Sequence, residues 1–428
     1  MRIWILNHYA TDMFFDGTGR HQALGKYLVR SGHEVKIFCA NTVHNSDIVV
    51  DTGGYNAKEE MGPDGVPYIF IKTKPYKGNG IGRIRNMVQF WKNVKKAVKN
   101  KVKEDGKPDI ILASSVHPLT LVAGIQIKKK LNIPCVCEIR DLWPETFVSL
   151  GKMRRGSLLV RLMYEGEHWI YKKADKLVFT MPGGEEYIKD QKWAGDVELE
   201  KVHHINNGVD LEQFYENRKN YKISDEDLEN DNTFKIIYAG SIREVNRVNE
   251  LVSAAEILRK KHIDNVKIIV FGDGTQRKQL EGKSKKLNLN NIVFKGRVDK
   301  KYIPYILSRG DLNMVTVDNN DLGRYGISWN KMFEYMASGK PTIVNYDMGK
   351  YNLVSDYDFG IAKKYASVEE LCDDIILLLK LTCDEYNKLS QNALVAAKEY
   401  DYRELADKLE YILEVAINDY KSNRRGRE

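Results

Sequence analysis

The sequence predicts an α/β protein made of two doubly wound parallel sheets. Short apolar segments that end in glycine-bearing polar loops alternate with segments of helical periodicity, and the alternation runs through both halves of the chain. It breaks once, over the polar and charged residues 215–232. The length of 428 residues agrees with a division there, because one compact core seldom holds so many.

The first half opens as strand, loop, helix and strand, which is a βαβ unit. The expected strands are 3–6, 35–39, 68–72, 109–114, 134–139 and 177–180. The expected helices are 22–30, 85–102, 119–131 and 154–173. We therefore predict an N-terminal domain over residues 1–205 and a linker over 206–232.

The second half repeats the alternation. The expected strands are 234–239, 266–271, 292–295, 312–316 and 342–344. The expected helices are 248–261, 276–287, 301–308, one within 326–341, 367–380, 384–400 and 403–420. We predict a C-terminal domain over 233–400, and a terminal helix within 401–428 that packs back toward the N-terminal domain and ends in a frayed tail.

Composition favours a folded protein of the reduced cytoplasm. Hydrophobic residues make up 43% and charged residues 29% of the chain. No apolar run reaches the roughly 18–20 residues of a membrane span, and the N-terminus enters a strand without a signal-peptide pattern. Five cysteines in apolar or helical settings form neither a disulfide framework nor a zinc motif.

Positive charge is concentrated between residues 72 and 107. This segment contains twelve Lys and Arg residues and only two acidic residues, which gives a local excess of +10. One interpretation is a solvated helix face whose apolar stripe contacts the core. The other is docking on an anionic membrane surface, with a second basic and apolar junction at 152–155. Nucleic acid is not an expected partner, because no known nucleic-acid module accompanies the charge.

The segment 326–341 is the strongest candidate for a ligand site. Asn330 is a cap-type residue before a short helix that Gly339 can end. Lys331 and Glu334 would lie in its first turns, where free N–H groups suit a phosphate. Lys331 could supply charge to a diphosphate, and Glu334 could accept hydrogen bonds from a ribose diol. The alternative is an ordinary αβ unit with a surface Lys and Glu.

Three loops of the first half also follow strands, at the edge where open α/β sheets bind ligands. Gly17 and Gly19 either give backbone room to a ligand or belong to a flexible connector. His117 either contacts a ligand or is structural. The third loop could bind a hydroxyl-rich molecule or form an Arg–carboxylate pair that locks the loop. Its residues are Arg140, Asp141 and Glu145.

Several short motifs, in this order and spacing, resemble glycosyltransferase family 4, which contains retaining enzymes of the GT-B type. After the first glycine loop they occupy residues 31–35, 207–210 with Phe214, 238–241, 271–274, 294–298, 331–337 and 339–341. Residues 140–145 look like the branch that adds amino sugars in bacterial surface-polysaccharide synthesis.

The resemblance implies two Rossmann-like domains that face a cleft, and a nucleotide-sugar donor held mainly by the C-terminal domain. It implies catalytic roles for His117, Arg243, Lys331 and Glu334. It implies donor-binding roles for Gly17, Gly19, Gly240, Ser241, Arg247, Gly272, Asp273, Gly274, Arg297, Asn330 and Tyr335. It implies acceptor-side roles for Arg140, Asp141 and Glu145. The family is generally metal-independent, so no metal and no cofactor are expected.

The chain departs from the family pattern in two places. Many members have another Glu eight positions before the one that resembles Glu334, with seven residues between the two, and Gly326 stands at that position in this chain. Many also have an Arg and a Lys after the Gly-Ser loop. Arg243 and Arg247 are the candidates here, with Asn246 between them, and we favour Arg243.

We therefore expect a retaining glycosyltransferase that acts at the inner face of the cell membrane. It would transfer an N-acetylated hexosamine or deoxyhexosamine from a UDP-sugar to a polyprenyl-diphosphate-linked glycan, in O-antigen or capsule synthesis. One alternative is a UDP-sugar 2-epimerase-like isomerase with Asp141 and Glu145 as its acid and base. Another is a non-catalytic sugar-nucleotide-binding subunit, which the missing carboxylate at Gly326 favours.

Overall fold

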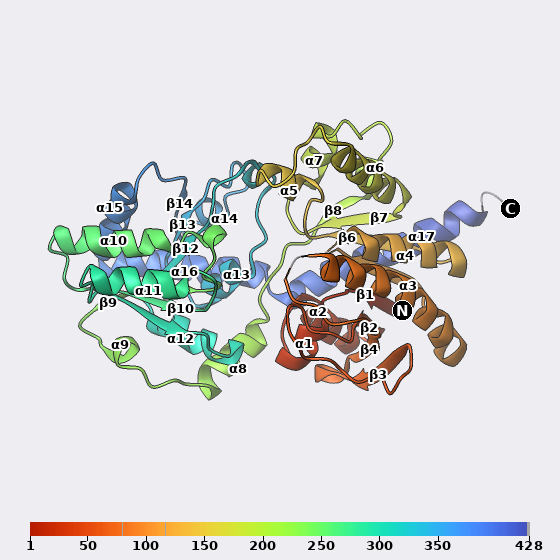
Figure 1. Ribbon diagram of the computed structural model, residues 1–428, viewed down its shortest axis with the longest axis horizontal. Coiled ribbons are helices and arrows are strands. Elements are labelled where there is room, and N and C mark those ends of the chain that lie inside the picture. Colours follow the sequence, from red (N-terminus) through yellow and green to blue (C-terminus); the bar gives the residue numbers. More distant parts are fainter. Residues whose placement is uncertain (79, 116, 426–428) are drawn as a thin grey trace. The chain divides into compact units, whose positions relative to one another are not determined.

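The computed structural model describes residues 1–78, 80–115 and 117–425 and divides into two compact α/β units (Figure 1). The first unit contains Met1–Asn206 and the C-terminal segment from Tyr402, and the second contains Asn207–Asp401. Each unit has its own, mainly parallel sheet, so the predicted fold class is confirmed. Residues 426–428 of the expected terminal helix lie outside the described residues.

The first sheet has the strand order β3-β4-β2-β1-β5-β6-β7-β8, and β3 alone runs antiparallel to its neighbour. Its strands are β1 Arg2–Leu6, β2 Glu34–Ala40, β3 Ala57–Met61, β4 Pro67–Ile71, β5 Ile110–Ser114, β6 Cys135–Ile139, β7 Lys176–Phe179 and β8 Val202–His204. The edge strand β3 was not predicted, because its sequence Ala-Lys-Glu-Glu-Met is mostly charged and exposed. Charged residues are common on edge strands, where they discourage pairing with another chain.

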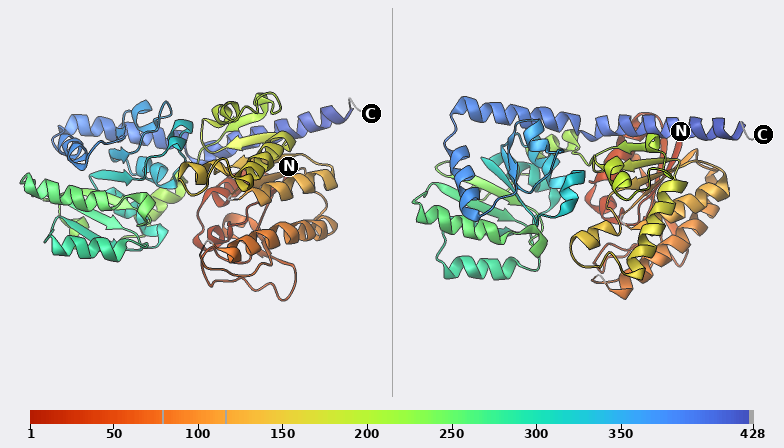
Figure 2. Two further views of the ribbon diagram at one scale, coloured as in Figure 1. Left: turned by 45° about the horizontal axis from the view of Figure 1, so that its top comes forward. Right: turned by 90° about the horizontal axis from the view of Figure 1, so that it is seen from above.

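Helices cover both faces of this sheet (Figure 2). They are α1 Thr11–Asp16, α2 Arg20–Arg30, α3 Ile81–Asp105, α4 Pro118–Leu131, α5 Glu145–Ser149, α6 Leu158–Lys173, α7 Gly184–Asp190 and α17 Tyr402–Arg425, with 3-10 turns η1 Pro63–Gly65 and η2 Leu199–Lys201. On one face, α2 and α17 pack together on side chains such as Ile5 and Leu112, and Leu409 of α17 is fully buried there. On the other face, α4 approaches so closely that a β-carbon on Gly124 would lie 2.6 Å from that of Ala113.

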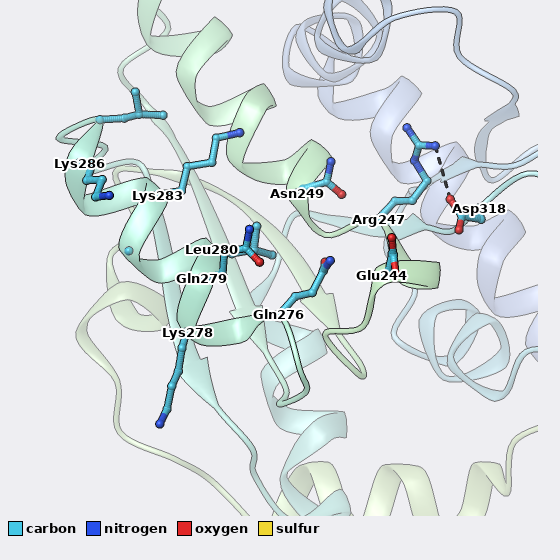
Figure 3. A pocket seen from close by; sticks show the side chains of 12 residues that line it. Glu244, Arg247, Asn249, Gln276, Lys278, Gln279, Leu280, Lys283, Lys286 and Asp318 are labelled. Atoms are coloured by element: carbon cyan, nitrogen blue, oxygen red, sulfur yellow. Dashed lines mark hydrogen bonds and ion pairs between the residues drawn. The ribbon is translucent and has the colours of Figure 1, made fainter. Parts of the chain in front are cut away.

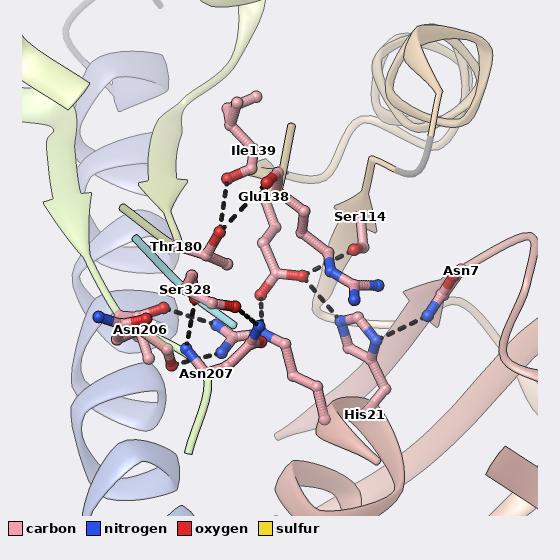
Figure 4. Close-up of polar contacts among 12 residues, drawn as sticks. Asn7, His21, Ser114, Glu138, Ile139, Thr180, Asn206, Asn207 and Ser328 are labelled. Carbon is pink, nitrogen blue, oxygen red and sulfur yellow. Dashed lines mark hydrogen bonds and ion pairs between the residues drawn. The ribbon is translucent and has the colours of Figure 1, made fainter. Parts of the chain in front are cut away.

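A buried polar network joins the carboxyl ends of the central strands (Figure 4). Glu138 on β6 accepts hydrogen bonds from Arg20 Nε at 2.8 Å and from Ser114 Oγ at 2.7 Å, and lies 2.9 Å from His21 Nε2. Arg20 also donates to the backbone oxygens of Ile205 and Asn206, at 3.0 and 2.6 Å. The network therefore ties the start of α2 to the chain after β8.

The charges of Glu138 and Arg20 compensate each other in this network. Burial alone would raise the pKa of Glu138, but Arg20 and His21 hold it well below its usual range. Burial lowers the pKa of His21 against the pull of Glu138, so the imidazole is neutral. It donates from Nε2 to Glu138 and accepts at Nδ1 from the Asn7 amide at 2.8 Å. All four side chains are buried, so each polar atom in these contacts depends on its partner.

The second sheet is parallel, with the order β11-β10-β9-β12-β13-β14. Its strands are β9 Phe234–Ala239, β10 Val266–Phe271, β11 Ile292–Gly296, β12 Leu312–Thr316, β13 Thr342–Asn345 and β14 Gly360–Lys363. Its helices are α8 Leu211–Asn220, α9 Glu226–Glu229, α10 Asn249–Lys260, α11 Arg277–Lys286, α12 Ile303–Arg309, α13 Asn330–Ala337, α14 Leu353–Asp356, α15 Val368–Leu379 and α16 Cys383–Glu399, with η3 Glu244–Asn246, η4 Lys300–Tyr302 and η5 Asp321–Tyr325. A linker was expected over residues 206–232, but residues 207–232 belong to this unit and contain α8 and α9, and Leu228 of α9 is fully buried.

The basic helix α3 combines a core face with an exposed start. Phe90 and Val94 are fully buried, so the apolar stripe contacts the core as the first interpretation expected. The first turn differs, because Ile81 and Ile84 remain 68% and 58% exposed. None of the helices in the described ranges has both the length and the apolar character that crossing a membrane requires.

We predict that Glu138→Gln lowers the free energy of unfolding of the first unit by about 3–5 kcal/mol, because it leaves the buried Arg20 guanidinium without its counter-charge. Urea denaturation measures this. Glu34→Gln is the matched control, since Glu34 forms an exposed ion pair with Arg2 and its loss should cost less than about 1 kcal/mol. Equal effects of the two variants would show that the buried network does not stabilise the unit.

Candidate active site

Two glycines shape the strand-end loops of the second unit. The parallel pairing continues beyond the strands, because Gly240 N–H donates to Phe271 O at 3.0 Å and Ile242 N–H to Asp273 O at 2.9 Å. A β-carbon on Gly272 would lie 1.8 Å from Gly240 O, and one on Gly274 would lie 2.3 Å from Ile242 O. Their φ angles are +144° and +159°. Only glycine fits such an approach, so the loops present backbone rather than side chains.

Lys331 lies directly against the Gly240 loop. It is the second residue of α13, and its Nζ is 4.8 Å from the centroid of the Tyr238 ring. The same atom lies 3.1 Å from where a β-carbon on Gly240 would be. Burial lowers the pKa of Lys331 to about 8, although nearby Glu334 favours the charged form. A cation is therefore held beside the exposed backbone of the loop.

Glu334 follows one helical turn later and is half-buried. Burial raises the pKa of Glu334, and the charges of Lys300 and Lys331 oppose this. Asn330, the first residue of the same helix, is exposed. The three residues predicted from segment 326–341 thus lie on one short helix, with Asn330 and Lys331 in its first turn and Glu334 in its second.

Tyr335 does not lie with Asn330, Lys331 and Glu334 on the accessible side of the helix. Its side chain is fully buried in the apolar core, and its hydroxyl oxygen accepts from Ala239 N–H at 2.9 Å. The structure therefore corrects the expectation of a direct donor contact, because this hydroxyl holds the end of β9 instead.

The loop after Gly240 contains a hydrogen-bonded neutral pair and two arginines with different surroundings. Ser241 Oγ donates to Asn246 Oδ1 at 2.9 Å. Arg247 turns away to Glu250, at 2.6 Å, and to Asp318, at 3.4 Å. Arg243 is exposed, and its guanidinium makes no hydrogen bond or ion pair within the described residues. Of the two candidate arginines, Arg247 is therefore the one with carboxylate partners among the described residues.

The other predicted donor residues lie on the neighbouring strand exits. Asp273 Oδ1 accepts from Gly274 N–H at 2.8 Å, and its other oxygen is 3.9 Å from Arg277. Arg297 is exposed directly after β11. Gly272 N–H donates to Gly296 O at 2.8 Å, which holds these two exits together.

A groove of about 940 Å³ opens beside the loop, between η3, α10 and α11 (Figure 3). Arg247 is the predicted site residue in its lining. Its rim carries the lysines Lys278, Lys283 and Lys286. The groove flanks the Gly240 loop, and Lys331 and Glu334 do not line it.

His117 of the first unit is fully buried at the start of α4. Its Nε2 lies 2.5 Å from His8 Nδ1, and His8 stacks on Phe90 with 4.4 Å between ring centroids. Burial, assisted by the charge of Arg83, lowers the pKa of His117 to about 3. The pair is therefore neutral at physiological pH. His8 was not identified from the sequence, although its place just after β1 was a usable signal.

The first glycine loop contains a short helix that was not predicted. Gly17 ends α1 in the left-handed conformation, with φ +63°, and Gly19 precedes α2 with φ +116°. A β-carbon on Gly19 would lie 3.0 Å from Met13 Cγ. Both glycines are thus required by the backbone path.

The three acceptor-side candidates do not form one cluster. Glu145 is buried and accepts from Arg155 at 2.5 Å and from Tyr164 at 2.6 Å. The locking interpretation therefore holds for Glu145, but with Arg155 as the partner. Arg140 and Asp141 lie before it, and Asp141 is exposed. Across residues 1–78, 80–115 and 117–425, no three His, Cys, Asp or Glu side chains converge as a metal site.

Family models match both halves of the chain. Residues 16–213 match the model described as Glycosyltransferase Family 4, and residues 219–396 match the model described as Glycosyl transferases group 1. The two matches and the paired parallel sheets identify the chain as a glycosyltransferase of the GT-B fold. The comparison with curated proteins returns no match.

Solved structures show the same fold at low identity. Sucrose-phosphate synthase from Thermosynechococcus elongatus superposes with a TM-score of 0.71 at 15% identity, over 98% of this chain and 100% of that one. HepE of Anabaena, in complex with UDP, gives 0.66 at 16%, over 97% and 100%. WaaG, a glycosyltransferase involved in lipopolysaccharide biosynthesis, gives 0.62 at 15%, over 96% and 99%.

We predict that Gly272→Ala lowers the free energy of unfolding of the second unit by more than about 1 kcal/mol, because its methyl group would collide with Gly240 O. Gly282→Ala is the control. It lies inside α11 with open space around the added carbon, and should stabilise the unit by about 0.5–1 kcal/mol. Urea denaturation compares the two. A Gly272→Ala variant as stable as wild type would contradict the close approach of the loops.

Proposed function

We propose that the protein is a retaining, metal-independent glycosyltransferase that uses a UDP-sugar. The sugar is an N-acetylated hexosamine or deoxyhexosamine, and the acceptor is a lipid-linked glycan in bacterial O-antigen or capsule synthesis. The observation that carries the proposal is the placement of Lys331 in the first turn of α13, against the backbone of the Gly240 loop, with Glu334 one helical turn further on. This combines a cation, a carboxylate and free N–H groups, which are the groups that a nucleoside diphosphate needs.

Similar proteins support the choice of donor. HepE of Anabaena has been solved with UDP and with UDP-glucose. WaaG takes part in lipopolysaccharide biosynthesis. Both share the fold over nearly the whole chain, so a UDP-sugar and a surface-glycan acceptor are the chemistry to test first.

In the proposed reaction, the residues of the second unit stabilise the departing diphosphate. Lys331 and the N–H groups at the start of α13 face the charge that develops on the leaving oxygen, and Arg243 adds a second cation. Glu334 accepts hydrogen bonds from the ribose. The acceptor hydroxyl attacks the anomeric carbon from the face that the leaving phosphate vacates and transfers its proton to the departing phosphate oxygen, so that the anomeric configuration is retained. His117 stays neutral and orients the transferred sugar.

Exposed apolar side chains support a peripheral position at the inner membrane face. Leu158, Leu159 and Leu162 of α6 are 75%, 59% and 60% exposed, directly after the basic residues 152–155. Apolar side chains next to Lys and Arg suit an anionic membrane surface. The exposed start of α3 repeats this combination.

The epimerase alternative gains no support, because the Glu145 carboxylate that it needs is bound by Arg155 and Tyr164. The missing carboxylate at Gly326 still allows a non-catalytic sugar-nucleotide-binding subunit. Product formation from a UDP-sugar and a lipid-linked acceptor separates that subunit from the enzyme.

Calorimetric titration with a panel of nucleoside diphosphates tests the donor. We expect selective binding of UDP, weakened by about 10- to 100-fold in Glu334→Ala, because hydrogen bonds to a charged group are lost. Glu369→Ala, an exposed carboxylate of α15 in the same unit, should bind like wild type. If wild type binds no nucleotide, the proposed function is wrong.

The pKa of Lys331 predicts how UDP affinity depends on pH. The diphosphate binds the protonated amine, whose pKa is about 8 in the free protein. Affinity should therefore be complete below pH 8 and fall above it, by up to about tenfold per pH unit. Lys331→Arg should remove the fall, because a guanidinium stays charged. Titrations between pH 6.5 and 9.5 measure this, and identical profiles for the two proteins would exclude Lys331 as the responsible group.

A further inference from the structure

A second polar cluster lies at the carboxyl edge of the first sheet, outside the roles assigned above. Tyr9 follows β1 and His44 follows β2, while Tyr76 lies after β4. Arg83 belongs to the first turn of α3. Four separate segments thus bring two hydroxyls, an imidazole and a guanidinium together.

The hydrogen bonds of this cluster run in one direction and end at Tyr9. Asn45 Nδ2 donates to His44 Nε2 at 3.1 Å, which leaves the His44 proton on Nδ1, 2.5 Å from the Tyr76 hydroxyl. Tyr76 then donates to the Tyr9 hydroxyl at 3.1 Å, and Arg83 Nε donates to the same oxygen at 3.1 Å.

The Tyr9 hydroxyl hydrogen is therefore left to donate outward. Its oxygen already accepts from two donors, and within the described residues no acceptor is recorded for its hydrogen. Each group in this chain of hydrogen bonds donates to the next, so the last hydroxyl, that of Tyr9, needs a ligand that accepts a hydrogen bond. Phosphate oxygens are such a group.

Electrostatics point to the same ligand. The Arg83 guanidinium lies 5.8 Å from the centroid of the Tyr9 ring, held on its face and at its hydroxyl. Burial, then the charges around it, keep the pKa of His8 low, and Arg83 acts in the same direction on His117. Neither histidine adds charge. Arg83, a residue suited to phosphate recognition, is the cation at the Tyr9 hydroxyl, and its charge also opposes the effect of burial on the pKa of the nearby Asp141 carboxyl.

Apolar side chains lie on the same helical turn. Ile81 and Ile84, on either side of Arg83 in sequence, are 68% and 58% exposed. A phosphate subsite bordered by exposed aliphatic side chains matches a molecule with an anionic head and a hydrocarbon tail.

We propose that Tyr9 and Arg83, oriented by Tyr76 and His44, bind the diphosphate of the lipid-linked acceptor, while Ile81 and Ile84 contact the first isoprene units. The inference rests on the proposed function and names the acceptor contacts that it needs. Arg83 and Tyr9 touch the acceptor, whereas Tyr76 and His44 are positioning residues.

The test is binding of geranyl diphosphate in solution, without a membrane and with UDP present at saturation. Inorganic diphosphate and geraniol are titrated in parallel. We expect Arg83→Gln to weaken geranyl diphosphate binding by about tenfold or more. Tyr9→Phe keeps the ring and should weaken it less. Arg85→Gln removes the same charge two residues away and should bind like wild type. UDP affinity should stay unchanged in all three variants.

The possible outcomes are distinct. If wild type binds UDP but not geranyl diphosphate, this subsite is wrong and the proposed function stands. If it binds no UDP, the proposed function fails first. Equal affinity for inorganic and geranyl diphosphate would overturn the lipid assignment in favour of free phosphate. Equal losses in Arg83→Gln and Arg85→Gln would overturn the assignment to Arg83, because any cation of that turn would then serve.

Discussion

The buried carboxylate of Glu138 is the interaction on which the first unit depends. Its two oxygens accept hydrogen bonds from a guanidinium and an imidazole of α2 and from a hydroxyl of β5, all away from water. Burying a charge costs free energy unless the charge is paired and hydrogen-bonded. The Glu138 carboxylate can therefore be buried only if its three partners are in place at the same time. Arg20 also donates hydrogen bonds to the backbone after β8. The same side chain therefore fixes the start of α2, which follows the first glycine loop, and the segment that leaves the sheet after β8. Tyr9 and His8 then take their positions two residues and one residue after Asn7, which belongs to the same network.

The loops at the carboxyl edge of the second sheet are held by backbone contacts rather than by buried charged side chains. Its loops approach through glycines, with carbonyl oxygens occupying the space of absent side chains at Gly272 and Gly274. The charge of Lys331 lies beside the backbone of the Gly240 loop and over the Tyr238 ring. The carboxyl edge of the first unit is thus ordered by side-chain charge, and that of the second by backbone packing.

Much of the fold could be predicted from the sequence because buried parallel strands and amphipathic helices leave clear periodicities. The same argument explains the misses. The edge strand β3 is charged and exposed, and the helix α1 lies inside a polar loop, so neither shows a periodic apolar pattern. Helices α8 and α9 lie in a stretch whose charges suggested a linker, although a few buried side chains such as Phe214 and Leu228 dock it.

For the site, sequence reasoning identified positions but not side-chain directions. Lys331 and Glu334 follow from helix signals and lie where expected. Tyr335 is adjacent to Glu334, yet helical geometry turns it toward the core. Arg247 could not be separated from Arg243 by spacing, because its carboxylate partners Glu250 and Asp318 are set by the fold. His8 and Arg83 come from distant segments, and only the folded sheet edge brings them together.

The return of the chain to the first unit affects the order in which the protein is made. Helix α17 supplies buried residues such as Leu405, Leu409 and Leu413 to the core formed with α2. Those residues leave the ribosome after all of the second unit, residues 207–401. Domains usually fold as units during synthesis, so the second unit can finish while the first still exposes the apolar side of α2. The half of the protein that is synthesised first is therefore the half that completes its core last, and during that interval it depends on protection from aggregation.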